Sequence, residues 1–152
     1  SFCMAFRHQL LQRHTSSESL QGFFARISDP SRRAVMEDIV TNGLDSPRLR
    51  LAALAYEKLI SDMAAALADS EWLVGGKISL ADFAMLPYIE RLEQLQLSGW
   101  WEAYPQLNQW LAQLRASQAY TVGIRDWSNP SYIRLMNESG SVAWPHMKAL
   151  LG

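Results

Sequence analysis

Hydrophobic residues recur at helical spacing along most of the chain. Phe2, Phe6 and Leu10 stand four residues apart among polar neighbours, which predicts an amphipathic helix over residues 2–13. Residues 47–68 carry the longest apolar stripe, opposite a charged face, and predict the longest helix. The stripe consists of Ala52, Tyr56, Leu59, Met63 and Leu67. Because no alternating pattern long enough for a strand occurs, the chain is predicted to be all-α.

Prolines and glycines mark the ends of further helices. Asp29 directly before Pro30 predicts a helix start, and Gly43 predicts the end of that helix. Pro105 predicts another start, and a core-facing stripe follows it: Leu107, Trp110, Leu111 and Leu114. Residues 14–30 predict a loop or a short helical turn, and two short segments, about 131–138 and 142–151, are expected to close the chain.

The most specific start signal precedes a helix predicted over residues 80–96. Ser79 and Asp82 have the spacing of a capping box. In a capping box, the side chain of each residue accepts a hydrogen bond from the backbone N–H of the other. Ile78 and Phe83 flank the box and predict a hydrophobic staple. Pro87 stands inside this helix and removes the hydrogen bond to the Phe83 carbonyl, which costs about 3 kcal/mol in an exposed helix. We therefore expect the tertiary structure to compensate.

Composition and charge narrow the class of protein. A chain of 152 residues, of which 49% are apolar, is expected to fold as one domain. Its formal net charge of -1 disfavours a nucleic acid or an anionic membrane as partner. A single cysteine, with no signal peptide and no membrane-spanning apolar run, favours a cytoplasmic location. Since the chain opens on Ser1 inside an apolar run, we expect its first helix to be truncated at the N-terminus.

The sequence contains no recognisable catalytic set. No P-loop, dinucleotide fingerprint or Gly-x-Ser-x-Gly motif occurs. Glu90 and Glu93 lie one helical turn apart, but we interpret them as a solvated face rather than an acid–base pair. No metal site is predicted, because the histidines lack ligand spacing: His8, His14 and His146.

Two stretches resemble a known family. The segment "EWLVGGKISLADFAMLPYIERL", followed by "YPQLNQWLAQLRASQAY", resembles the C-terminal helical domain of the cytosolic glutathione S-transferases. Trp72, Leu73 and Gly75 match the turn before that family's capping box, and Ser79 and Asp82 match the box itself. The resemblance covers roughly residues 2–120, and other segments resemble bacterial members. It implies a single all-α domain over residues 1–152, a helical bundle of about five to seven helices.

In that family a separate thioredoxin-like domain binds glutathione and activates its thiol, and this sequence shows no counterpart of it. The resemblance therefore implies glutathione as co-substrate of a complete enzyme, and no activity for this chain alone. The helical domain would form the wall for a hydrophobic electrophile and part of a homodimer interface. The matching wall positions are Phe2, Cys3, Phe6, Leu10 and Trp127. The alternative interpretation is that each of these five residues is an ordinary part of the hydrophobic core.

A second function remains open at this point. The same helical fold also occurs in free-standing modules that bind other proteins, and an exposed apolar patch would fit either function. The coding sequence upstream of Ser1 distinguishes the two. A thioredoxin-like domain there favours the transferase, and an immediate start codon favours the interaction module.

Overall fold

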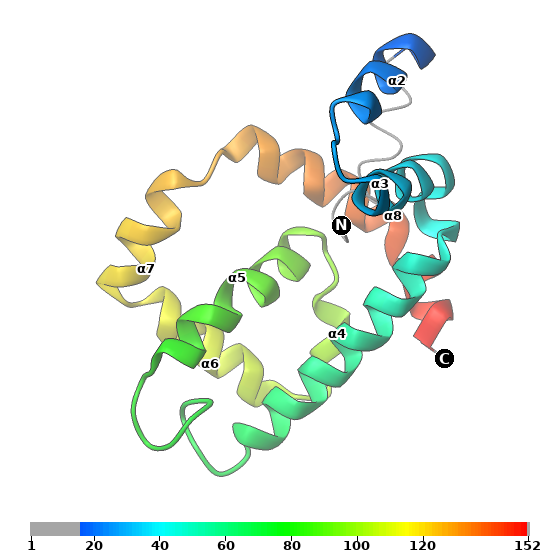
Figure 1. Cartoon of the computed structure of the whole chain (residues 1–152). Coiled ribbons are helices and arrows are strands. Elements are labelled where there is room, and N and C mark those ends of the chain that lie inside the picture. The colour runs from blue at the N-terminus through cyan, green and yellow to red at the C-terminus, as the bar shows by residue number, and fades with distance from the viewer. Residues whose placement is uncertain (1–15, 152) are drawn as a thin grey trace. The chain divides into compact units, whose positions relative to one another are not determined.

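The computed structural model describes residues 16–151 and consists of helices joined by turns and, between α4 and α5, by a longer non-helical segment, residues 67–79 (Figure 1). Its α-helices are α2 (Ser17–Ala25), α3 (Pro30–Asn42), α4 (Pro47–Ala66), α5 (Leu80–Gln94), α6 (Pro105–Arg115), α7 (Gln118–Gly123) and α8 (Pro130–Leu151). Three 3₁₀ helices connect them: η1 (Gly43–Asp45), η2 (Ser98–Trp101) and η3 (Arg125–Trp127). No strand occurs between residues 16 and 151, so the predicted all-α class is confirmed.

The chain divides into two compact units, and each is described separately below. One unit contains residues up to Ala55 together with Val142–Gly152, and the other is Tyr56–Ser141. Helices α4 and α8 each contribute residues to both units. Within the described part of the chain, no helix is long and apolar enough to cross a membrane.

In the first unit, side chains fix both ends of α3. Asp29 caps its start, because the carboxylate accepts hydrogen bonds from the N–H groups of Ser31 at 2.9 Å and Arg32 at 3.4 Å. Gly43 ends the helix with φ 54°, a conformation that favours glycine. The predicted boundaries of this helix are therefore confirmed.

The segment before α3 is more helical than predicted. Residues 14–30 were expected to form a loop or a short helical turn, and Ser17–Ala25 form a longer helix of nine residues. Ser16 caps this helix by accepting a hydrogen bond from the Ser19 N–H at 3.3 Å, and Glu18 lies in the first turn, where a negative charge is favourable. The polar residues of this segment are thus helix-capping rather than loop-forming.

In the second unit, α5 packs against α6 through fully buried side chains. Leu86, Ile89 and Leu92 on α5 have no exposed surface. The stripe predicted on α6 is confirmed, since all four of its members are buried: Leu107, Trp110, Leu111 and Leu114. Burial of this size supplies the main driving force for packing the two helices.

The stripe on α4 differs from the predicted one by about one residue. Met63 and Leu67 are buried as expected. Ala53 and Ile60 are also buried, whereas their neighbours Ala52 and Leu59 are only partly buried. The buried residues still recur at intervals of three, four and seven, as expected for a helix of 3.6 residues per turn.

The end of the chain also differs from the prediction. Residues 130–151 form one helix, α8, rather than two short segments. The expected break lay at Gly140, a poor helix former. Gly140 is buried, and a Cβ atom at this position would lie 1.8 Å from the Leu95 carbonyl oxygen. The glycine therefore permits a close backbone approach and does not end the helix.

Pro87 lies within α5, which continues without interruption from Leu80 to Gln94. We expected surrounding helices to compensate for the hydrogen bond that this proline removes. The structure instead places Pro87 on the exposed side of the helix.

Candidate ligand-binding cleft

The start of α5 is organised around the carboxylate of Asp82, which has no exposed surface. Oδ2 accepts hydrogen bonds from the Ser79 N–H at 2.8 Å and the Ser79 hydroxyl at 2.9 Å. The Ser79 oxygen in turn accepts a hydrogen bond from the Ala81 N–H at 3.2 Å. Both halves of the capping box are present.

Asp82 also binds two groups that the capping box does not involve. Its Oδ1 accepts hydrogen bonds from the Leu73 N–H and from the indole N–H of Trp110, both at 2.9 Å. Burial alone raises the pKa of Asp82, but the donors at Leu73, Trp110 and Ser79 outweigh it and hold the pKa below its usual value. The carboxylate thus joins the preceding turn, α5 and α6 as a charged group.

A cleft of about 350 Å³ opens beside the second half of α5. One wall comes from α5 itself: Pro87, Glu90, Arg91 and Gln94. This wall includes the exposed Pro87 and the buried Glu90, with Arg91 and Gln94 partly buried. The volume lies at the lower end of the range of pockets for small molecules, roughly 300 to 1,000 Å³.

The opposite wall comes from the turn after α7 and from the first turns of α8. Trp127 on η3 lines it and is 83% exposed. The indole N–H of Trp127 donates to the Val122 carbonyl at 2.9 Å, so the ring is held in place although it faces solvent. Apolar and aromatic groups continue this wall along the chain: Ile124, Tyr132, Ile133 and Met136.

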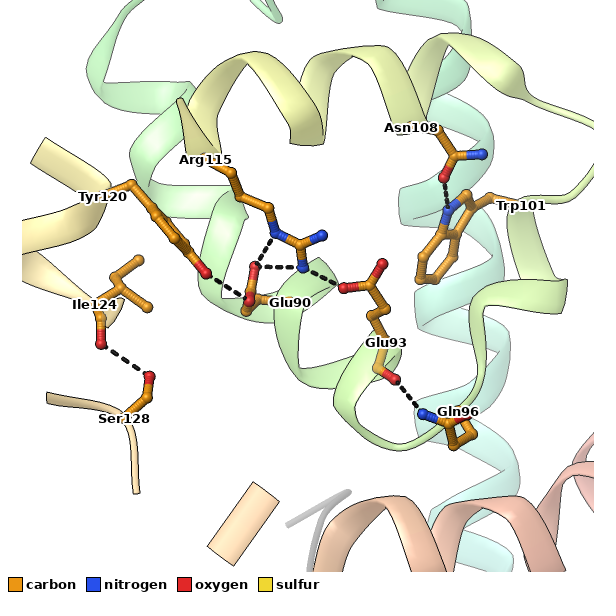
Figure 2. A network of polar contacts seen from close by, with 9 residues as sticks. All are labelled: Glu90, Glu93, Gln96, Trp101, Asn108, Arg115, Tyr120, Ile124 and Ser128. Atoms are coloured by element: carbon orange, nitrogen blue, oxygen red, sulfur yellow. Dashed lines mark hydrogen bonds and ion pairs between the residues drawn. The ribbon is translucent and has the colours of Figure 1, made fainter. Parts of the chain in front are cut away.

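A network of ion pairs borders the cleft at Glu90 (Figure 2). The Glu90 carboxylate accepts hydrogen bonds from Arg115 at 2.9 and 3.2 Å and from the Tyr120 hydroxyl at 2.9 Å. Arg115 also pairs with Glu93 (Figure 2). The network therefore connects α5, α6 and α7.

The predicted solvated face at Glu90 and Glu93 is wrong for Glu90, which is only 8% exposed. Glu90 stands four residues after the buried Leu86, so it continues the buried face of α5. Burial raises the pKa of the Tyr120 phenol, and the hydrogen bond and charge of Glu90 raise it further. The arrangement is structural, because all three groups already pair with one another.

The sequence-predicted site residues fall into three groups. Phe2, Cys3, Phe6 and Leu10 lie outside the described residues. Trp127 lines the cleft. The residues of the capping box and staple lie together at the start of α5: Ile78, Ser79, Asp82 and Phe83. Of the two staple residues, Ile78 is 43% exposed and Phe83 is partly buried.

Arg91 and Tyr132 were not predicted as site residues, although both line the cleft. The Arg91 guanidinium lies 5.8 Å from the centre of the Tyr132 ring, a distance suited to a cation–π interaction. Forty-one positions separate the two residues in the sequence, so no local pattern could have related them.

Metal-binding geometry is not found in the part of the chain that the structure describes. Within residues 16–151, no group of three or more His, Cys, Asp or Glu side chains could hold a metal ion. The polar side-chain groups at the cleft are a guanidinium, a carboxylate in an ion pair, two amides, two hydroxyls and an indole N–H. Such groups bind and orient a ligand rather than activate a nucleophile.

Comparison with known proteins finds a similarity in the central part of the chain. Residues 46–113 match the family described as "Glutathione S-transferase, C-terminal domain". Over 76 residues the chain is 30% identical to the glutathione S-transferase hmp2 of Hypomyces subiculosus. That match covers 50% of this chain and 36% of the relative, so the chain spans well under half of its length. No solved structure matches significantly.

The family match contains the Asp82 centre but only part of the cleft. Its 46–113 span includes α4, α5 and most of α6, with the turn at Trp72 and the capping box. Trp127 and the α8 wall of the cleft lie beyond it. The likeness to a transferase therefore rests on the helical scaffold, and the cleft is a feature of this chain's own structure.

Proposed function

We propose that the chain is the helical domain of a glutathione transferase and that the cleft at Trp127 receives a hydrophobic electrophilic co-substrate. The observation that carries the proposal is the family match over residues 46–113, which includes the buried Asp82 and its capping box. The cleft adds an exposed indole that is held in place and bordered by apolar side chains. An aromatic surface of this kind favours aromatic or apolar ligands.

The proposal assigns the chemistry to a different part of the complete enzyme. Glutathione is the co-substrate, held and activated mainly by a thioredoxin-like domain, as the family likeness suggests. Residues 1–152 then act as one helical domain that also contributes to a homodimer interface. The complete protein is cytoplasmic and acts on small molecules, in keeping with its near-neutral net charge of -1.

The coding region immediately upstream of Ser1 gives the first test. A thioredoxin-like strand–helix–strand domain encoded there supports the proposal. A start codon directly before Ser1, with no such domain on the same transcript, contradicts it and favours a protein-interaction module instead. This test needs no assumption about the substrate.

Kinetics of the complete protein test the role of the cleft. We expect Trp127→Ala to raise KM for an apolar aromatic electrophile about tenfold, because it removes an aromatic contact. KM for glutathione should remain unchanged, since the cleft is not proposed to hold glutathione. Tyr88→Ala is a matched control, because Tyr88 is an aromatic residue on α5 that is 51% exposed and does not line the cleft. Equal effects of both variants would contradict the assignment.

A further inference from the structure

Arg91 places a positive charge in the cleft without a negative partner among the described residues. Its guanidinium Nη1 lies 2.6 Å from the Met136 thioether sulfur, which is uncharged and only a weak acceptor. Its other contact is the face of the Tyr132 ring. No Asp or Glu carboxylate of residues 16–151 lies within ion-pair distance of Arg91, and residues 1–15 contain neither residue type.

The carboxylate of Glu90, which also lines the cleft, is directed to other partners. One of its oxygens accepts two hydrogen bonds from Arg115, and the other accepts one from Tyr120 (Figure 2). Glu90 is 8% exposed, so little of it is available to a ligand. The charge that the cleft presents to a small molecule is therefore mainly that of Arg91.

Asn129 is a further polar residue of the cleft, and its side-chain oxygen is already paired. Asn129 lines the cleft and caps α8, because its side-chain oxygen accepts hydrogen bonds from the N–H groups of Ser131 at 3.0 Å and Tyr132 at 3.2 Å. Because these N–H groups are already paired, the start of α8 does not offer them to an anion in the cleft. A guanidinium suits the binding of an anion, because its planar donors match the two oxygens of a carboxylate or sulfonate.

The aromatic side of the cleft lies within the same group of lining residues. Trp127 is 83% exposed, yet its indole N–H is fixed to the Val122 carbonyl. An exposed ring whose position is fixed loses little conformational entropy when a second ring stacks on it. The cleft thus combines one cation with one preorganised aromatic surface, in a volume of about 350 Å³.

We propose that the cleft binds aromatic molecules that carry a single anionic group, with Arg91 holding the anion and Trp127 the ring. This inference names the substrate class of the cleft and therefore rests on the proposed function. Its test needs only ligand binding to the chain and no transferase activity. A failure of the inference is therefore distinguishable from a failure of the proposed function, which depends on the upstream domain and on KM.

Two fluorescent probes with the same ring system test the inference. Anilinonaphthalene sulfonate carries one negative charge, and N-phenylnaphthylamine lacks the sulfonate. We expect the wild-type chain to bind the sulfonate about tenfold more tightly than the neutral probe, which corresponds to one charge-assisted contact. Arg91→Gln should abolish this preference by weakening the binding of the sulfonate probe alone. Trp127→Ala should weaken the binding of both probes.

The matched control is Arg134→Gln, which removes the same charge from an exposed position on α8 that does not line the cleft. Equal effects of Arg134→Gln and Arg91→Gln would overturn the inference, because the preference would then reflect net charge. Equal binding of the two probes to the wild-type chain would also overturn it, and this comparison requires no variant. Circular dichroism of each variant verifies that the helices are retained.

Discussion

At the scale of single residues, Asp82 connects several segments of the second unit. Its buried carboxylate accepts four hydrogen bonds, from Leu73, Trp110 and two groups of Ser79. The contact with Ser79 could be predicted from the sequence, because a capping box is local. The contact with Trp110 could not, since it joins positions 28 residues apart and depends on how α6 packs. The functional consequence is that one carboxylate fixes the turn at Leu73 relative to α5 and α6.

We expect Asp82→Ala to lower the free energy of unfolding by about 3 kcal/mol, because several buried donors lose their acceptor. The effect should depend on pH. The pKa of Asp82 in the folded protein lies below its usual value, which is about 3.9 in an unfolded chain. The contribution of the charged form is then fully present above the unfolded pKa and is lost as pH falls through the folded pKa.

Urea unfolding between neutral and acidic pH measures both effects. The difference between wild type and Asp82→Ala should be constant near neutral pH and should shrink below about pH 4. Asp62→Ala provides the control, because Asp62 pairs with Lys58 at an exposed position and its side chain is 62% exposed. If the urea unfolding midpoint of Asp82→Ala equalled that of the wild type, the hydrogen bonds of Asp82 would not stabilise the protein.

At the scale of elements, the two ends of α3 could be predicted from the sequence, whereas the uninterrupted α8 could not. The start of α3 at Asp29 and Pro30 follows from local chemistry, as does its end at Gly43. The single long α8 does not, because Gly140 in a sequence normally favours a break. Only the structure shows that this glycine faces the Leu95 carbonyl, and the contact depends on the packing of residues 45 positions apart.

Gly140→Ala should destabilise the protein by about 2 kcal/mol or more. Alanine is the better helix former by about 1 kcal/mol, so propensity alone predicts the opposite sign. The steric term dominates, because the new Cβ would lie 1.8 Å from a backbone oxygen, which cannot rotate away as a side chain can. Thermal and urea unfolding of the variant measure the change.

The matched control for this prediction is Gly22→Ala in α2, where a Cβ atom would meet nothing within 4 Å. It should be neutral or stabilising by up to about 1 kcal/mol, as expected for glycine to alanine in a helix. If both variants behave alike, the close approach of Gly140 to Leu95 does not determine the fold of α8.

At the scale of the whole molecule, the scaffold and the cleft differ in what the sequence can predict. The family likeness depends on residues that are close in the sequence, from the turn at Trp72 to the capping box. The cleft instead combines side chains from α5, η3 and α8, including Arg91, Trp127 and Tyr132. Trp127 was predicted as a site residue from the family resemblance, whereas Arg91 required the three-dimensional arrangement. Ligand-binding residues drawn from separate helices carry no common spacing.

The same division leads to a prediction about glutathione. The chain of 152 residues should not bind glutathione saturably at micromolar concentrations, since the family likeness assigns that site to a separate domain. Glutathione carries carboxylates that Arg91 could attract, but it has no aromatic group to contact Trp127. One exposed charge contact alone contributes little affinity in water.

Isothermal titration calorimetry of the chain with glutathione makes the measurement, and anilinonaphthalene sulfonate serves as the positive control for an intact cleft. We expect heat of binding for the sulfonate and none above dilution for glutathione. Saturable binding of glutathione at micromolar concentration would show that these residues contain a complete glutathione site. If glutathione also displaced the sulfonate, and if Arg91→Gln lost glutathione binding, the glutathione site would lie in the cleft. The helical domain would then hold glutathione itself, and the thioredoxin-like domain would not be needed for binding.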